Sequence, residues 1–97
     1  MKVLDWSDEK SKKLKEERGY SFEDIVFFIQ KQYILANYRH PNKNKYLNQR
    51  IMVLNIDNYA YLVPYTENGE ELFLKTIIPS RKATKLYLKG DGKNEIK

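Results

Sequence analysis

The sequence has no cysteine and only one histidine, one tryptophan, four glycines and three prolines among its 97 residues. The absence of cysteine excludes disulfide bonds, thiolate catalysis and zinc sites that need a thiolate ligand, and it makes a reducing cytoplasm the natural setting. A single histidine excludes acid–base catalysis by two imidazoles. We therefore expect packing alone to hold the fold, and other residue types to share any proton transfer.

No run approaches the roughly 18 apolar residues that a membrane-spanning helix needs. The N-terminus reaches the charged Asp5 and Asp8 too early to form the apolar core of a signal peptide. Glycine-rich phosphate loops, serine-centred nucleophile motifs and metal-ligand spacings are also missing. The sequence thus predicts a cytoplasmic protein with no membrane association, no metal and no cofactor.

Charge of one sign is missing from two stretches. Residues 39–50 carry four basic and no acidic side chains, and residues 51–74 carry four acidic and no basic ones. Residues 75–97 then carry seven basic side chains against two acidic ones. Two basic blocks favour a polyanion as partner, because phosphate neutralisation is a common use of a surface of one sign. Ordinary lysine-rich solubility explains the composition equally well.

The hydrophobic pattern predicts one α+β domain over residues 1–97, with residues 90–97 as a flexible polar tail. A short strand is expected at 2–6. An exposed helix then begins after the capping residue Ser7 and ends at Gly19. The core helix is expected over 21–31, because apolar residues recur there at helical spacing.

The second half of the sequence predicts an antiparallel four-stranded meander followed by a C-terminal helix. Proline cannot donate to a sheet ladder, so Pro64 is expected at an edge or a bulge. Tyr59, Tyr61, Val63 and Tyr65 are expected on one face of their strand, unless a bulge at Pro64 shifts Tyr65 out of phase. The predicted strands are 33–38, 50–56, 59–65 and 72–78, and the predicted helix is 81–89.

Three stretches carry a family resemblance: LDWSDEKSKKLKEERGYSFEDI (4–25), VPYTENGEE (63–71) and IIPSRKATK (77–85). In this order they resemble the BrnT family of bacterial toxins, which are RelE-like ribonucleases. The resemblance implies a RelE-like fold and an endoribonuclease that cleaves RNA. It also implies neutralisation by a cognate DNA-binding antitoxin, through which the protein forms an oligomer. Three positions depart from the family pattern: Arg18, Thr76 and Tyr87.

Metal-independent cleavage of RNA uses the 2′-hydroxyl as nucleophile, so the protein must move two protons and stabilise negative charge at phosphorus. Arg81 and Lys82 begin the C-terminal helix, where free N–H groups favour phosphate. Tyr65 and His40 are the acid–base candidates, although a plain loop histidine is the more ordinary role for His40. Glu67 is a possible general base or, more commonly, a turn residue.

The predicted catalytic set is therefore Arg81, Lys82, Tyr65 and His40, without a metal. The other cations of the two basic blocks are assigned to RNA binding. We expect the loop over 39–50 and the C-terminal helix to converge on a single groove. The RNA-binding residues are Arg39, Lys43, Lys45, Arg50, Lys85 and Lys89.

Two other classes of function remain open. In the first, the same surface binds nucleic acid or an antitoxin without catalysis, a reading that the three departures from the family pattern favour. In the second, the basic face meets only an acidic antitoxin, and the affinity for RNA is negligible.

Overall fold

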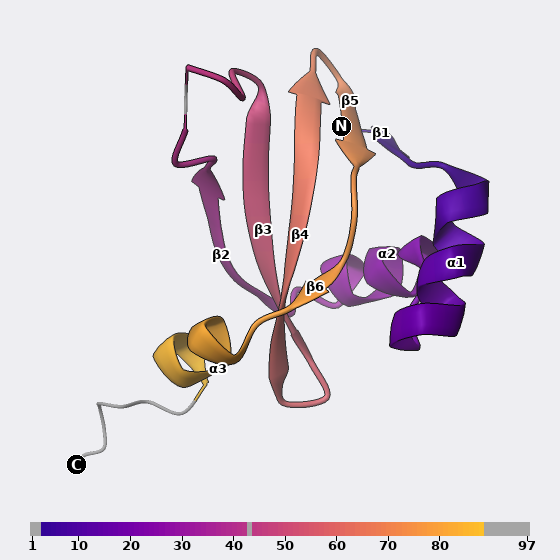
Figure 1. The fold of residues 1–97 in the computed structure, drawn as a ribbon, viewed down its shortest axis with the longest axis vertical. Helices are drawn as coiled ribbons and strands as arrows, with labels where there is room; N and C mark the ends of the chain where they lie inside the picture. Colours follow the sequence, from indigo (N-terminus) through magenta and orange to yellow (C-terminus); the bar gives the residue numbers. More distant parts are fainter. Residues whose placement is uncertain (1–2, 43, 89–97) are drawn as a thin grey trace.

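A single mixed sheet separates two helices on one face from a third helix on the other in the computed structural model (Figure 1). The structure describes residues 3–42 and 44–88. Lys43, Lys89 and the polar tail over 90–97 lie outside the described residues. Within these ranges, no helix has the length and apolarity needed to cross a bilayer.

The N-terminal third forms a strand and two helices, as the sequence predicts. These elements are β1 (Val3–Asp5), α1 (Asp8–Arg18) and α2 (Phe22–Gln30). The Ser7 side chain caps α1, which ends at Gly19 in the left-handed region, at a φ of 86°. Ser21 and Asp24 form a complete capping box at the start of α2. Local signals therefore set both helix boundaries.

The antiparallel meander is confirmed, with the order β2–β3–β4–β5. Asp57 and Asn58 join β3 to β4 and both have positive φ, of 53° and 68°, as a two-residue type I′ hairpin requires. β1 extends the sheet by pairing parallel to β5. The strands are β2 (Ile34–Arg39), β3 (Gln49–Ile56), β4 (Tyr59–Asn68), β5 (Glu71–Leu74) and β6 (Ile78–Pro79), and the last helix is α3 (Arg81–Tyr87).

The predicted strand over 72–78 is wrong as one element, because the chain leaves the ladder between β5 and β6. Pro64 explains where the break falls. It lies in the central strand β4, paired with Ile51, and its carbonyl accepts a 2.8 Å hydrogen bond from the Lys75 N–H. The nitrogen of Pro64 points to the same side as its carbonyl, toward the gap in the neighbouring ladder. The sheet therefore accommodates the absent N–H of Pro64 where the neighbouring strand is interrupted between β5 and β6, and not at a sheet edge.

Alternate residues of the sheet bury their side chains in two different cores. The larger core lies between the sheet and the helices α1 and α2, and it contains Phe22, Ile25 and Leu54, all 0% exposed. The smaller core lies on the opposite face, where Val53 and Ala60 pack beneath Ala83 of α3. The Ala60 N–H donates to Thr84 Oγ1 over 2.9 Å, which ties α3 to β4. Each face of the sheet therefore carries its own helical cover.

Candidate functional site

Two arginines lie directly opposite each other on neighbouring strands. Arg39 pairs with Arg50 across β2 and β3, and Arg50 pairs with Tyr65 across β3 and β4. Opposed residues project from the same face of a sheet, so these side chains form a row across three strands. Tyr65 belongs to the core beneath α1 and α2. The row therefore lies on the face that these two helices cover.

Arg39 and Arg50 line a small hollow of about 270 Å³, together with Leu47, Asn48 and Glu67. Glu67 follows Tyr65 by two positions on β4 and thus shares its face. The Glu67 N–H donates to the Asn48 carbonyl over 2.9 Å, and Arg39 Nη2 lies 3.4 Å from the Leu47 carbonyl. The strand ends and the loop together hold two cations and one carboxylate around this space.

Tyr65 lies opposite Arg50 in the sheet, and only 3% of its surface is exposed. Its hydroxyl lies 2.8 Å from Nδ2 and 3.1 Å from Oδ1 of Asn37. Asn37 Oδ1 also accepts a 2.9 Å hydrogen bond from Arg50 Nε. The hydroxyl of this predicted acid–base residue therefore meets Asn37, and through it Arg50. The prediction that Tyr61, Val63 and Tyr65 share a face is confirmed.

His40 and Lys45 gather around Tyr46 in the loop between β2 and β3. The rings of His40 and Tyr46 lie 4.2 Å apart, and Lys45 Nζ lies 5.4 Å from the centre of the Tyr46 ring. His40 Nδ1 accepts the Asn42 N–H over 3.1 Å, which leaves Nε2 as its outward nitrogen. Neither His40 nor Lys45 is among the residues that line the hollow.

The cations of α3 lie over the other face of the sheet. Lys82 lines a second hollow of about 220 Å³ with Tyr38, Leu62, Ser80, Ala83, Leu86 and Tyr87. This hollow is mostly apolar. The pKa of Tyr38 is raised, mainly because the side chain is partly buried and to a lesser extent because Tyr87 lies nearby. Arg81 and Lys85 are exposed on the same helix. The Ala83 N–H at the start of α3 is taken by Ser80 Oγ, over 3.0 Å.

The expectation of one groove for both basic blocks is therefore wrong. Arg39 and Arg50 project from the face that carries α1 and α2, whereas α3 packs over Val53 and Ala60 on the opposite face. After β6 the chain continues into α3 on that side, so the sheet stands between the two sets of cations (Figure 1). The sequence cannot reveal this separation, because it depends on which face the last helix covers.

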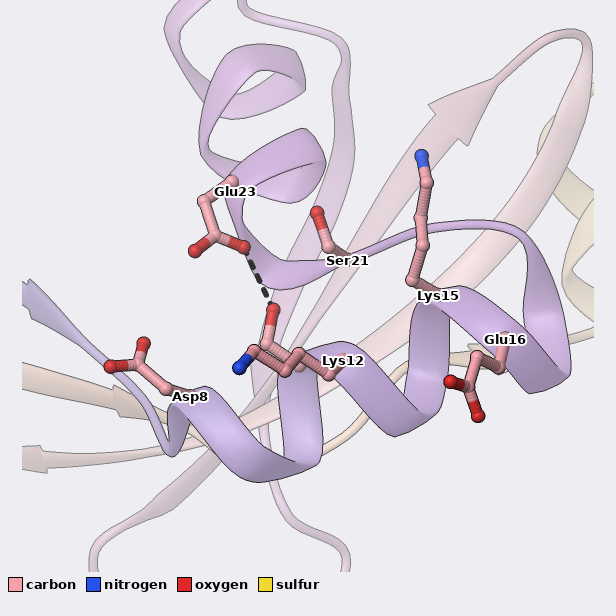
Figure 2. A pocket seen from close by; sticks show the side chains of 7 residues that line it. Asp8, Lys12, Lys15, Glu16, Ser21 and Glu23 are labelled. Atoms are coloured by element: carbon pink, nitrogen blue, oxygen red, sulfur yellow. Dashed lines mark hydrogen bonds between the residues drawn. The ribbon is translucent and has the colours of Figure 1, made fainter.

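A third hollow, of about 610 Å³, lies between α1 and α2 and contains none of the predicted site residues (Figure 2). Its floor is Ser11, which is 2% exposed, donates to Glu23 Oε1 over 2.8 Å and accepts the Phe22 N–H over 2.9 Å. The Ser11 hydrogen bond is the main cause of a lowered pKa at Glu23. Lys15, on its rim, forms a 2.9 Å ion pair with Asp24. Carboxylates of both helices surround two lysines of α1 here, as in a helix-packing contact.

Glu67 lines the hollow of about 270 Å³, Asn37 contacts Arg50 on its wall, and the sequence indicates neither role strongly. The neighbouring Asn68-Gly69 pair favours a turn role for Glu67, although alternation along the strand places it in phase with Tyr65. No sequence pattern indicates the contacts of Asn37, because they depend on the pairing of three strands. Among the described residues, no group of three or more histidine, aspartate or glutamate side chains is arranged to hold a metal.

Searches of known protein families, curated proteins and solved structures find no match to this chain.

Proposed function

We propose that this protein is the toxin of a toxin–antitoxin system and a metal-independent endoribonuclease that holds one phosphodiester between Arg39 and Arg50. The observation that carries the proposal is the in-register pairing of these arginines beside Glu67. Like charges directly opposite each other destabilise a sheet, and an anion between them removes that repulsion. Guanidinium groups also offer the bidentate geometry that suits phosphate oxygens.

The chemistry assigned to the hollow is transfer of the phosphorus from the 5′-oxygen to the 2′-oxygen. Glu67 accepts the 2′-hydroxyl proton as that oxygen attacks phosphorus, and solvent water donates a proton to the departing 5′-oxygen, because His40 does not line the hollow. The products are a 2′,3′-cyclic phosphate and a 5′-hydroxyl. Arg39 and Arg50 stabilise the negative charge that develops on the phosphorus oxygens. In this scheme Tyr65 supports the site through Asn37.

The cations of α3 are assigned a separate contact under this proposal. Arg81, Lys82 and Lys85 lie over the opposite face from the hollow, so they act on a different part of the RNA or on the acidic antitoxin. Replacing Arg81 by alanine is therefore expected to weaken binding without abolishing cleavage of a short RNA.

A cleavage assay with a defined RNA in the presence of a chelator tests the proposal. The wild-type protein should release fragments with 2′,3′-cyclic ends, and Arg50→Ala should slow cleavage by roughly 100-fold or more, as loss of a charge-stabilising donor does elsewhere. Lys13→Ala is the matched control, because Lys13 is an exposed cation on α1. Equal cleavage by wild type and Arg50→Ala would refute the assignment of the hollow.

A non-catalytic binding module is the second candidate, and one observation favours it. Tyr65 is buried against Asn37, and the only histidine lies at Tyr46 and not on the wall of the hollow. Saturable, salt-sensitive RNA binding without cleavage would identify this module. Negligible RNA affinity even at low salt would instead leave the antitoxin as the partner of the basic surface.

A further inference from the structure

Asn37 connects a cation of the hollow to the core of the sheet. Its Oδ1 accepts the 2.9 Å hydrogen bond from Arg50 Nε, and its backbone carbonyl lies 3.5 Å from Arg50 Nη2. On the other side, Nδ2 lies 2.8 Å from the Tyr65 hydroxyl. Tyr65 is 3% exposed, whereas Asn37 itself is exposed. A fixed aromatic ring thus anchors one end of the amide, and a guanidinium occupies the other.

Arg50 fixes the orientation of the amide. Arg50 has only donors, so it must face the amide oxygen of Asn37. The amide nitrogen then faces the Tyr65 hydroxyl, which can accept its hydrogen bond. Rotating the amide by half a turn would set its N–H groups against the donors of Arg50. Arg50 therefore selects one orientation, and the Tyr65 hydroxyl, which lies within reach of both Nδ2 and Oδ1, is compatible with it.

This contact determines which part of Arg50 remains for a ligand. Nε and Nη2 form the side-on edge of the guanidinium, and both point to oxygens of Asn37. The end-on edge, formed by Nη1 and the second N–H of Nη2, is thereby left for an incoming phosphate. Without Asn37, the long Arg50 side chain would lose rotamer freedom when it binds phosphate, which weakens binding.

We infer that Asn37 is a positioning residue, which together with Tyr65 holds Arg50 in one orientation so that its end-on edge receives a phosphate. The inference rests on the proposed function only in that Arg50 must contact phosphate, and it holds whether or not the RNA is cleaved. It predicts that Asn37 influences RNA solely through Arg50.

A binding cycle with a 2′-O-methyl oligoribonucleotide tests this prediction, because the methyl group blocks cleavage. Asn37→Ala should weaken binding about tenfold, as loss of residues that orient a ligating side chain commonly does. In the Arg50→Ala background the same substitution should have no further effect, since it acts through the missing side chain. Asn44→Ala is the control, because Asn44 is an exposed asparagine of the neighbouring loop.

A second measurement uses the free protein. Nuclear magnetic resonance of the arginine Nε–H groups should show slow hydrogen exchange at Arg50 in the wild type and faster exchange in Asn37→Ala, with Tyr65→Phe in between. Unchanged exchange, or a loss of affinity that persists in the Arg50→Ala background, would overturn the inference while leaving the proposed function intact. Failure of the wild-type protein to bind the oligonucleotide would overturn both.

Discussion

The Tyr20 hydroxyl donates a 2.6 Å hydrogen bond to Oδ2 of Asp57. Tyr20 lies in the connection between α1 and α2, and Asp57 lies in the turn between β3 and β4. The Tyr20 ring also meets Tyr61 edge-on, with ring centres 5.5 Å apart. One tyrosine thereby fastens the helical layer to the far end of the central hairpin.

This bond predicts an unusual tyrosine titration. The hydrogen bond to Asp57, followed by burial, raises the pKa of Tyr20 to about 12 from an ordinary 10.0. A spectrophotometric titration at 295 nm should show this late step, and Asp57→Asn should move it toward ordinary values because the negative acceptor is lost. Asparagine tolerates the positive φ of position 57, so the turn is kept.

The same pKa shift sets the pH range over which the bond stabilises the fold. A raised pKa means that the neutral hydroxyl is favoured in the folded state, so the contribution is complete below about pH 10 and is lost as the pH rises toward about 12. Urea unfolding at a series of pH values checks this. An identical alkaline decline in Tyr20→Phe would contradict the assignment.

The start of α2 predicts a loss of stability in acid. The pKa of Glu23 is lowered mainly by the Ser11 hydroxyl, and that of Asp24 is lowered because hydrogen bonds from Ser21 and Lys15 outweigh the opposing effect of burial. A lowered pKa contributes stability above the ordinary values of 4.5 and 3.8, and the contribution disappears as the pH falls through the folded-state pKa values.

Thermal unfolding between pH 3 and pH 6 measures this effect. We expect Glu23→Gln to show a shallower decline in melting temperature on acidification than the wild type. Glu16→Gln on the exposed face of α1 is the control and should follow the wild-type curve. Parallel curves for all three proteins would rule out a role for Glu23 in acid stability.

The opposed arginines predict a conflict between stability and binding. Arg39→Gln removes one of two like charges that face each other, so it should stabilise the free protein by about 0.5 kcal/mol at low salt. The gain should shrink as salt screens the repulsion. Oligonucleotide affinity should fall in the same variant. A melting temperature lowered by Arg39→Gln at low salt would show that the arginine pair does not strain the free sheet.

The hydrogen bonds of Thr84 that attach α3 to β4 predict a large loss of stability when this one side chain is changed. Thr84 is 3% exposed, and its Oγ1 accepts the Ala60 N–H while donating to the Ser80 carbonyl over 2.8 Å. Thr84→Val keeps the shape but leaves a buried N–H without its acceptor, which costs about 1–3 kcal/mol. Thr84→Ser keeps the hydroxyl and should retain more of the stability. Chemical denaturation of both variants makes the comparison.

Much of the N-terminal third could be predicted because its signals are local. Ser7, Gly19 and the Ser21–Asp24 capping box act within a few residues of the helix ends that they set. Trp6 packs against Phe22, with ring centres 6.2 Å apart. These contacts give folding roles to several residues of the first stretch that resembles BrnT toxins.

The rest of the fold depends on contacts between distant parts of the chain. β1 pairs with β5, more than sixty positions away, for example through Leu4 and Leu72. No local pattern specifies that partner or its parallel direction. The face chosen by α3 is likewise fixed by small residues such as Ala60 and Ala83, which leave room for a helix but carry little signal in the sequence.

The site was predictable to the extent that it follows strand alternation. Alternation brings Glu67 into phase with Tyr65, so its place on the face of the hollow could have been read from β4 alone. The contact of Asn37 with Arg50 and Tyr65 could not be predicted from the sequence, because the pairing of β2 with β3 shifts register between Ile34 and Ala36. A single-residue shift exchanges the two faces of a strand.

The position of α3 behind the sheet also offers a practical handle. Leu86 is 64% exposed on that helix, and the chain has no natural cysteine. Leu86→Cys would therefore introduce a unique thiol for coupling a fluorophore or a sensor chip. Because the sheet separates this thiol from Arg39 and Arg50, the immobilised protein would present its arginines to the bulk solution.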